Sequence, residues 1–491
     1  MLEDKAIRGL PWAVMTYAGS KVITLVSTVV LARLLTPADF GLVALSFLVI
    51  NLVGVFRDLG LGGGFILRRD LDARAQGTVL TLMVGMGALL AAVVSGVSPL
   101  AAGWFDESRL DSILPVMSIT LVLGGFNWFY ETLLQRELEF RRRFVAVIAL
   151  TTAQVAVAIP LAVAGAGVWS LVAGWLAGWT AQAAALTALA PYRVRPAWDR
   201  AAARDVLGTS QGFMAQGALA FVQQNADFLA VGRMLGAGQL GLYTMAYRLA
   251  EIPYWAIADP AAKVTFPSFA GMHHRGEPVA PAFLSVFRLV ALVCLPLGLL
   301  LSAAAEPFTR LLFGDKWLNM IAALSVLGVW AAVRPLEGTA GWLLNSLGRA
   351  GLLAWITGLP LLVAVPAMFM AAGEGGILEV AWVILAYTAL TTAGIVWAVQ
   401  RCGVSLQDMW RSVRPAVLAA APAWVAARMV AEATDGAPAA IGLAAATVAG
   451  LSVYAAAASI AEPGILRRAI SQAGRMLRGA PATAPAAAAK P

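Results

Sequence analysis

The segment LARLLTPADFGLVAL at residues 31–45 recurs later in the chain as VGRMLGAGQLGLYTM at residues 231–245. The copies share these residues at matching positions: Arg33 with Arg233, Leu35 with Leu235, Gly41 with Gly241 and Leu42 with Leu242. Each copy follows one long apolar stretch and precedes another, so we interpret the repeat as a polar hinge between two membrane-spanning helices. The sequence therefore predicts a duplicated membrane protein.

The composition indicates that lipid solvates most of this chain. Its 491 residues are 60% hydrophobic and 13% charged, with a mean hydropathy of +0.79, which is more apolar surface than a water-soluble core of this length can bury. A helix needs about 20 apolar residues to cross a bilayer. We expect about 14 such helices, over residues 10–31, 40–59, 77–98, 112–132, 144–164, 167–190, 206–231, 240–268, 282–303, 318–345, 350–371, 377–398, 413–431 and 438–459. The predicted fold is an all-α polytopic membrane protein.

The basic residues orient this bundle, because short loops rich in lysine and arginine stay in the cytoplasm. With the N-terminus inside, the alternate segments that face the cytoplasm hold most of the 35 basic residues, among them the run Arg141-Arg142-Arg143 and the pair Arg334 and Arg349. Both termini are then cytoplasmic. The net charge of +8 is thus a topology signal, and we expect no nucleic-acid partner.

The hinges also predict the domain organisation. Six expected helices separate Arg33 from Arg233, and an even number keeps both copies in the same orientation. The halves are therefore parallel repeats, and we expect two six-helix lobes around a central cavity. The expected boundaries are 1–200 and 201–405 for the lobes, 406–465 for two extra transmembrane helices, and 466–491 for a basic, disordered cytoplasmic tail.

Several ordered segments resemble one known family. They are VVLARLLTPADFGLVAL at 29–45, FRDLGLGGGFILRR at 56–69, LLQRELEFRRR at 133–143 and NADFLAVGRMLGAGQLGLYTMAYRLAEIP at 225–253. They are similar to the polysaccharide transporters of the multidrug/oligosaccharidyl-lipid/polysaccharide exporter superfamily, the Wzx-type flippases. The resemblance covers most of residues 1–400.

This resemblance implies a function and its partners. It implies alternating access, and translocation of a polyprenyl-pyrophosphate-linked oligosaccharide across a bacterial inner membrane for exopolysaccharide, capsule or O-antigen assembly. Membrane lipids and polysaccharide polymerase or assembly proteins are the other expected partners. A lipid-II flippase or an ion-coupled drug exporter of the same superfamily is the alternative.

An enzyme acting on the same lipid, such as a membrane glycosyltransferase or polymerase, is a remote alternative. Such enzymes need catalytic groups in a large outer loop, whereas the longest outer loop expected here spans only residues 304–317. We expect no cofactor. We also expect no metal site, because His273 and His274 have no third ligand nearby in the sequence.

Charged side chains inside the expected spans are candidates for the transport site, because each costs about 2.5–3.5 kcal/mol on insertion scales and usually faces a wet cavity or a partner. Lys21 shares one helical face with Tyr17, Thr24 and Thr28. We interpret Lys21 as a cavity cation for the pyrophosphate. A snorkelling or carboxylate-paired lysine is the alternative. The resemblance to lipid-II flippases adds Arg57, at the inner end of the expected cavity.

The expected seventh helix carries a polar stripe that includes Gln216, Gln223 and Asp227, with Asn225 beside it. Amides suit a hydroxyl-rich sugar because each offers donors and an acceptor. Interhelical hydrogen bonding is the alternative for the amides. For Asp227 we consider binding of a coupling ion, or pairing with Arg233.

The expected eighth helix has the most charged residues of any span. Arg248 and Lys263 are candidate substrate cations, and Glu251 and Asp259 are candidate ion-coupling residues, although the spacings 248/251 and 259/263 also permit pairing within the helix. Three prolines recur every seven residues in this segment: Pro253, Pro260 and Pro267. We interpret them as a hinge that bends during alternating access. A static curved helix is the alternative.

Overall fold

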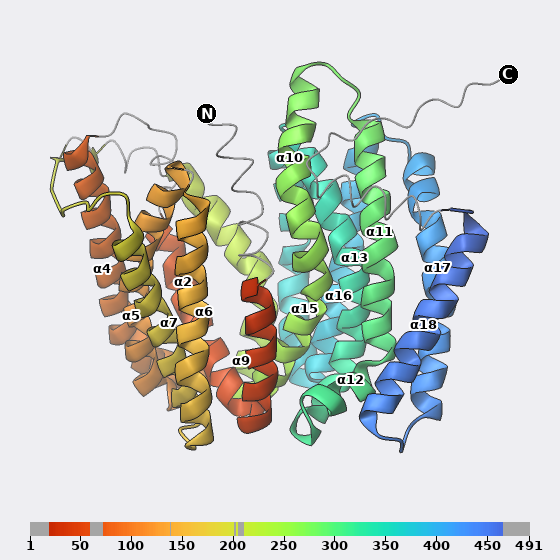
Figure 1. Cartoon of the computed structure of the whole chain (residues 1–491), viewed down its shortest axis with the longest axis horizontal. Helices are drawn as coiled ribbons and strands as arrows, with labels where there is room; N and C mark the ends of the chain where they lie inside the picture. Colours follow the sequence, from red (N-terminus) through yellow and green to blue (C-terminus); the bar gives the residue numbers. More distant parts are fainter. Residues whose placement is uncertain (1–18, 59–71, 138, 201–202, 205–210, 465–491) are drawn as a thin grey trace. The chain divides into compact units, whose positions relative to one another are not determined.

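The computed structural model describes residues 19–58, 72–137, 139–200, 203–204 and 211–464 (Figure 1). Every regular element among these residues is helical, and ten helical segments are long and apolar enough to cross a membrane. The predicted all-α membrane fold is therefore confirmed. By their contacts the residues divide into two compact units, Met1–Thr244 and Met245–Pro491. The predicted lobe boundary at residue 200 stays a prediction.

The first unit is a bundle of antiparallel helix pairs in which α4 packs along α5 and α6 along α7, while α2 packs against α4, α5 and α7. Before α2, a helix covers residues 19–34. The helices are α2 (Pro37–Asp58), α4 (Ala73–Phe105), α5 (Leu110–Arg136), α6 (Phe140–Val163), α7 (Val168–Leu189) and α9 (Gln211–Ala250), whose last residues belong to the second unit.

The second unit is built around α11 and α13, which pack against each other; α11 also packs against α17, and α13 against α16. Figure 1 shows α12 at the end of this unit opposite the connection between α10 and α11. The elements are a π-helix η1 (Tyr254–Ala258), α10 (Asp259–His274), α11 (Ala280–Ala303), α12 (Ala305–Leu312), a 3₁₀-helix η2 (Asp315–Met320), α13 (Ile321–Ser346), α14 (Ala350–Gly358), α15 (Leu361–Glu374), α16 (Ile377–Gln400), α17 (Leu406–Ala433) and α18 (Ala439–Ala461).

The two hinge copies turn the chain at the same place in the repeat by different means. In the first copy, the backbone N–H of Thr36 donates to Oδ2 of Asp39 at 3.0 Å, and the backbone N–H of Asp39 donates to Oγ1 of Thr36 at 3.3 Å. This is a capping box that starts α2. In the second copy, the position of Thr36 is taken by Gly236, whose φ of 77° and ψ of 180° interrupt α9. Glycine adopts this conformation without steric cost.

Glycines bring corresponding helix pairs close together in both units. A Cβ on Gly87 in α4 would lie 2.4 Å from the carbonyl oxygen of Leu121 in α5. In the second unit, a Cβ on Gly298 in α11 would lie 2.4 Å from the backbone nitrogen of Ala332 in α13. Small residues permit such close packing of membrane helices. The close approach of two helices at a glycine in both units is consistent with a parallel duplication.

The expected span over residues 240–268 corresponds to consecutive helical pieces. The second piece of α9 ends at Ala250, a π-helical turn follows at Tyr254–Ala258, and α10 begins at Asp259. Pro253 precedes the π-helix, and Pro260 lies in the first turn of α10. Proline has no backbone N–H, so each of them removes one donor from the backbone hydrogen bonds of the helix. Pro267 lies inside α10. Two of the three prolines thus flank the π-helix, and the hinge role of all three stays a prediction.

Candidate functional site

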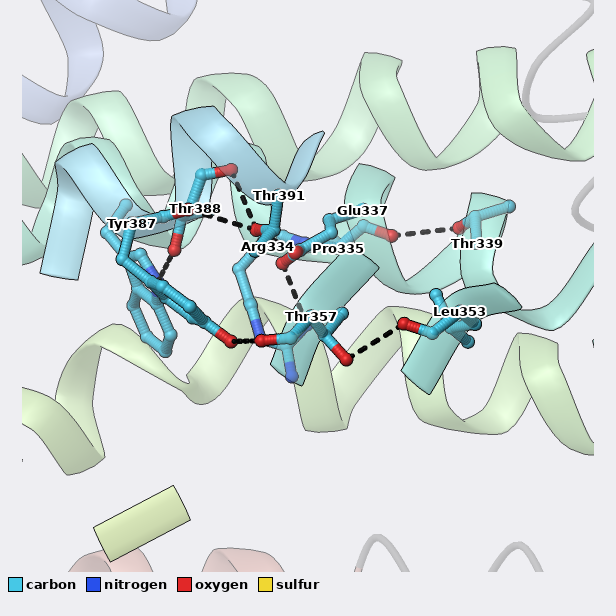
Figure 2. A network of polar contacts seen from close by, with 10 residues as sticks. Arg334, Pro335, Glu337, Thr339, Leu353, Thr357, Tyr387, Thr388 and Thr391 are labelled. Atoms are coloured by element: carbon cyan, nitrogen blue, oxygen red, sulfur yellow. Dashed lines mark hydrogen bonds and ion pairs between the residues drawn. The ribbon is translucent and has the colours of Figure 1, made fainter. Parts of the chain in front are cut away.

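The second unit holds an ion pair inside a membrane-spanning helix. Arg334 and Glu337 lie near the middle of α13, on either side of Pro335. Nη1 of Arg334 donates to Oε2 of Glu337 at 2.9 Å, and Oγ1 of Thr391 in α16 donates to Oε1 of Glu337 at 2.6 Å. Figure 2 shows these contacts together. Both carboxylate oxygens therefore have a partner. We call Arg334 and Glu337 the α13 ion pair.

The two partners of the α13 ion pair differ in exposure. The Glu337 side chain is 7% exposed, whereas that of Arg334 is 38% exposed. A guanidinium facing acyl chains near the middle of a span would be costly. The exposed part of Arg334 is therefore expected to face water and not acyl chains.

Aromatic rings surround the α13 ion pair. The ring of Tyr254, the first residue of η1, lies 5.2 Å from Cζ of Arg334, which is a cation–π distance. Trp330 lies one turn before Arg334; its ring centroid is 5.0 Å from that of Tyr247, and its Nε1 donates to Oγ1 of Thr388 at 3.0 Å. Single π-helical turns are frequent at functional sites. Cationic, aromatic and hydroxyl groups suited to an anionic, hydroxyl-rich ligand are thus assembled here.

Sequence reasoning missed this site. The charge pattern assigned Arg334 to a cytoplasmic segment with Arg349, but Arg334 lies within α13, and Arg349 follows the end of that helix. An available signal was the spacing of Arg334 and Glu337, three residues apart in an apolar segment, which permits pairing on one helical face. The contact with Thr391 joins residues far apart in the sequence and had no such signal.

The candidates around the end of α9 lie in the same unit. Arg248 stands in the last turn of α9 and is exposed, and Glu251 in the following turn interacts with it electrostatically. In α10, Nζ of Lys263 lies 3.0 Å from Oδ2 of Asp259, and both side chains are substantially exposed. Pairing within the helix, the alternative raised for Asp259 and Lys263, is therefore present in this structure.

Lys21 lies in the helix at 19–34 and is partly buried. The hydroxyls on its expected polar face bond to the helix backbone: Oγ1 of Thr24 donates to the carbonyl of Ser20 at 2.8 Å, and Oγ1 of Thr28 to that of Thr24 at 2.7 Å. The side chain of Arg57 lies outside the described residues, although its backbone belongs to α2.

The polar stripe of the expected seventh helix has mixed surroundings. Nδ2 of Asn225 donates to the carbonyl of Phe221 in the same helix at 2.9 Å, and Gln223 is partly buried. Asp227 is only 4% exposed, and its Oδ2 accepts a hydrogen bond from the hydroxyl of Tyr243 at 2.8 Å. The side chain of Gln216 lies outside the described residues.

Arg233 of the second hinge copy was considered in the sequence as a partner for Asp227. Cζ of Arg233 lies 5.6 Å from the centroid of the Trp104 ring at the end of α4. The guanidinium therefore has an aromatic contact within the first unit. In the described part of the chain, no three His, Cys, Asp or Glu side chains are grouped so that they could hold a metal ion.

An ion pair outside the membrane spans lowers the pKa of its carboxyl group. In the turn between α4 and α5, Nε and Nη2 of Arg109 donate to the two carboxylate oxygens of Glu107 at 2.9 and 3.0 Å. These hydrogen bonds lower the pKa of Glu107 from its ordinary value of 4.5, against the opposing effect of partial burial. The carboxylate form of Glu107 is therefore stabilised in the folded protein.

Comparisons with known proteins place the chain among polysaccharide biosynthesis proteins. The family described as polysaccharide biosynthesis protein matches residues 30–322. The succinoglycan biosynthesis transport protein ExoT of Rhizobium meliloti is 26% identical over 489 residues, which is 97% of each chain. The lipopolysaccharide biosynthesis protein WzxC of Escherichia coli is 26% identical over 354 residues, 71% of each chain.

A solved structure shares the fold. The lipid II flippase MurJ, in an inward closed conformation, matches with a TM-score of 0.75 over 92% of this chain and 99% of that one. The sequence identity is 11%, so this likeness concerns the fold alone.

Proposed function

Because this chain belongs to the family of polysaccharide biosynthesis proteins, we propose that it is a flippase that carries a polyprenyl-pyrophosphate-linked oligosaccharide across the bacterial inner membrane. The family match over residues 30–322 is the observation that carries this proposal. The fold shared with a lipid II flippase and the ten candidate membrane spans are consistent with it. Transport of this kind requires no catalytic residue.

The physical problem of this transport is the charged headgroup. A pyrophosphate and its sugars are strongly hydrated, and hydrocarbon offers no hydrogen bonds in exchange. A water-accessible site with positive and amide groups lowers the cost of moving the headgroup, while the prenyl tail stays in the lipid. The partly exposed Arg334 and the exposed Arg248 are cations of the kind that such a site requires.

We assign roles to the candidates on this basis. The proposed cations for the pyrophosphate are Lys21, Arg57, Arg248 and Lys263, and the proposed sugar-binding amides are Gln216, Gln223 and Asn225. The proposed ion-coupling carboxylates are Asp227, Glu251 and Asp259. Pro253, Pro260 and Pro267 are proposed to let the segment between α9 and α10 change its bend during alternating access. Lys263 already pairs with Asp259, so a phosphate must replace the Asp259 carboxylate as its partner.

The proposed orientation in the membrane follows from the distribution of basic residues along the chain. The N- and C-termini face the cytoplasm, where the lipid-linked oligosaccharide is assembled, and the product leaves on the outer side for a polymerase or another assembly protein. The energy comes from an ion gradient or from consumption of the product.

Deletion of the gene in its host tests the proposal. The deletion strain should lose a surface polysaccharide and accumulate its lipid-linked repeat unit, and the intact chain should restore export. Normal surface polysaccharide in the deletion strain, with no accumulated lipid intermediate, would overturn the proposal.

The second candidate is a lipid II flippase, the alternative that the sequence resemblance raised, and the fold shared with MurJ is compatible with both functions. It predicts that depletion causes accumulation of lipid II and cell lysis instead. The same strain therefore distinguishes the two functions by the identity of the accumulated lipid.

A further inference from the structure

Glu337 is a buried carboxylate in a membrane-spanning helix whose contacts differ on its two oxygens. Oε1 accepts from Thr391, a fully buried hydroxyl at 0% exposure, while Oε2 accepts from the partly exposed Arg334. Thr391 thus fixes the carboxylate from the interior of the unit, and Arg334 covers it from the water-accessible side. The arginine, not the carboxylate, is the group that a ligand meets.

Arg334 has more hydrogen-bond donors than Glu337 uses. A guanidinium carries five N–H groups, and among the described residues Glu337 accepts from one of them, at Nη1. The ring of Tyr254 supports the guanidinium at 5.2 Å. This ring approaches α13 closely because residue 338 is a glycine: a Cβ there would lie 2.9 Å from Cε2 of Tyr254. Arg334 is therefore held in place while much of its hydrogen-bonding capacity faces water.

We propose that Glu337 is the resident counter-anion of Arg334, and that a phosphate group of an incoming ligand displaces it. This inference rests on the proposed function, which supplies a pyrophosphate headgroup. The phosphate oxygen replaces Oε2 of Glu337 as the acceptor of the Nη1 proton, and no covalent bond of the ligand changes. Glu337 is assigned a positioning and charge-compensating role that extends the set of candidate residues.

Displacement leaves a carboxylate buried without its cation, which is costly. Glu337 then takes up one proton from water and becomes a neutral carboxyl group, still hydrogen-bonded to Thr391. Arg334 remains charged throughout. Binding of the anion is thus coupled to uptake of a proton, and release of the anion restores the α13 ion pair and releases the proton.

Other ionisable groups lie within electrostatic reach of the α13 ion pair. On the segment that packs against α13 these are Tyr247, Tyr254, Glu251 and Asp259, and on α16 the group is Tyr387. The carboxylates among these groups are Glu251 and Asp259. Glu251 and Asp259 are therefore the groups that a test must separate from Glu337.

The test is calorimetric titration of the full-length, detergent-solubilised protein with geranylgeranyl pyrophosphate, in buffers of different ionisation enthalpy. This measures affinity and proton uptake together. The wild type should take up about one more proton per bound ligand than Glu337→Gln, which cannot ionise and serves to subtract the ligand's own protonation. Glu337→Gln should bind about tenfold more tightly, because no carboxylate competes for Arg334. Glu251→Gln and Asp259→Asn separate the candidate groups: each should keep the excess of about one proton that Glu337→Gln loses, whatever its effect on transport.

Each outcome decides a different point. Equal affinity and equal proton uptake in the wild type and Glu337→Gln would overturn this inference and leave the proposed function standing. Weaker binding by Glu337→Gln would also overturn it, because that result is expected of a purely structural pair. Absence of binding by the wild type would contradict the proposed function and this inference together.

A second variant keeps the test decisive if Glu337→Gln does not fold. Thr391→Val removes the hydroxyl that fixes Oε1 but leaves the α13 ion pair charged. It should retain the proton uptake and change the affinity by less than Glu337→Gln, about threefold. Loss of proton uptake in Thr391→Val, at unchanged thermal stability, would contradict the assignment of the proton to Glu337.

Discussion

Gly41 and Gly241 form a reciprocal contact between the two hinge copies. A Cβ on Gly41 would lie 1.7 Å from the carbonyl oxygen of Ala237, and a Cβ on Gly241 would lie 1.8 Å from the carbonyl oxygen of Pro37. Pro37 and Ala237 are themselves matching positions of the repeat. The copies therefore touch with local twofold symmetry, at a distance that only glycine permits.

Gly41→Ala should destabilise the protein by about 1–3 kcal/mol, because its methyl group would collide with backbone atoms that cannot rotate away. Gly241→Ala should behave alike. Thermal unfolding of the solubilised protein measures the effect. Gly54→Ala in the same helix is the matched control, since nothing lies within 4 Å of a Cβ there. Equal stability of Gly41→Ala and Gly54→Ala would show that the close contact is absent in solution.

Tyr243→Phe should lower stability by about 1.5–3 kcal/mol, because it removes a hydrogen bond to the buried Asp227 carboxylate across the Gly236 break. Tyr192→Phe is the control, since Tyr192 is 41% exposed. Thermal unfolding of both variants checks the prediction, and a Tyr243→Phe protein as stable as the control would contradict it.

Glu107→Gln should lower stability near neutral pH but not in acid. The pKa of Glu107 is lowered in the folded state by its hydrogen bonds from Arg109. The contribution of the Glu107 carboxylate to the free energy of unfolding is therefore complete above the pKa of the unfolded state, about 4.5. This contribution disappears as the pH falls through the pKa of the folded state. We expect a small difference, about 0.2–1 kcal/mol, because Arg109 is about half exposed.

Unfolding of the wild type and Glu107→Gln at pH 6.5 and at pH 3.5 measures this dependence. Glu277→Gln is a matched control, because Glu277 makes the same two-pronged contact with Arg275 at an exposed position after α10. Its effect should be smaller at both pH values. If the difference in stability between the wild type and Glu107→Gln were larger at pH 3.5 than at pH 6.5, the lowered pKa of Glu107 would be contradicted.

Lys21→Ala and Arg248→Ala should each reduce polysaccharide export at least about tenfold at normal expression, because each removes a proposed cation for the pyrophosphate. Export in the complemented deletion strain, normalised to protein in the membrane, is the measurement. Arg411→Ala, in an exposed pair with Asp408 at the start of α17, should export normally. Unimpaired export by both test variants would remove Lys21 and Arg248 from the proposed site.

The sequence predicted the helical membrane fold and the family because both depend on features that run along the chain. Long apolar stretches reveal spans without knowledge of packing, and the pairing of Asp259 with Lys263 follows from helical spacing alone. The π-helix at Tyr254–Ala258 had no such signal, because the same prolines are compatible with a curved helix.

The α13 ion pair could not be predicted from loop charges. That method treats each arginine as a marker of topology, so it assigned Arg334 to the cytoplasm. The role of Arg334 depends on Tyr254 and Thr391, which only the folding of η1 and α16 against α13 brings near it. Contacts of this kind are absent from any local pattern.

Transbilayer movement of lipid in proteoliposomes measures the proposed flippase activity without other cellular components. The purified protein, reconstituted with a fluorescent polyprenyl-pyrophosphate-linked oligosaccharide, should move the labelled lipid between leaflets when an ion gradient is applied, and protein-free vesicles should not. Labelled lipid that stays in its original leaflet under every ion gradient, in vesicles that contain folded protein, would contradict the account.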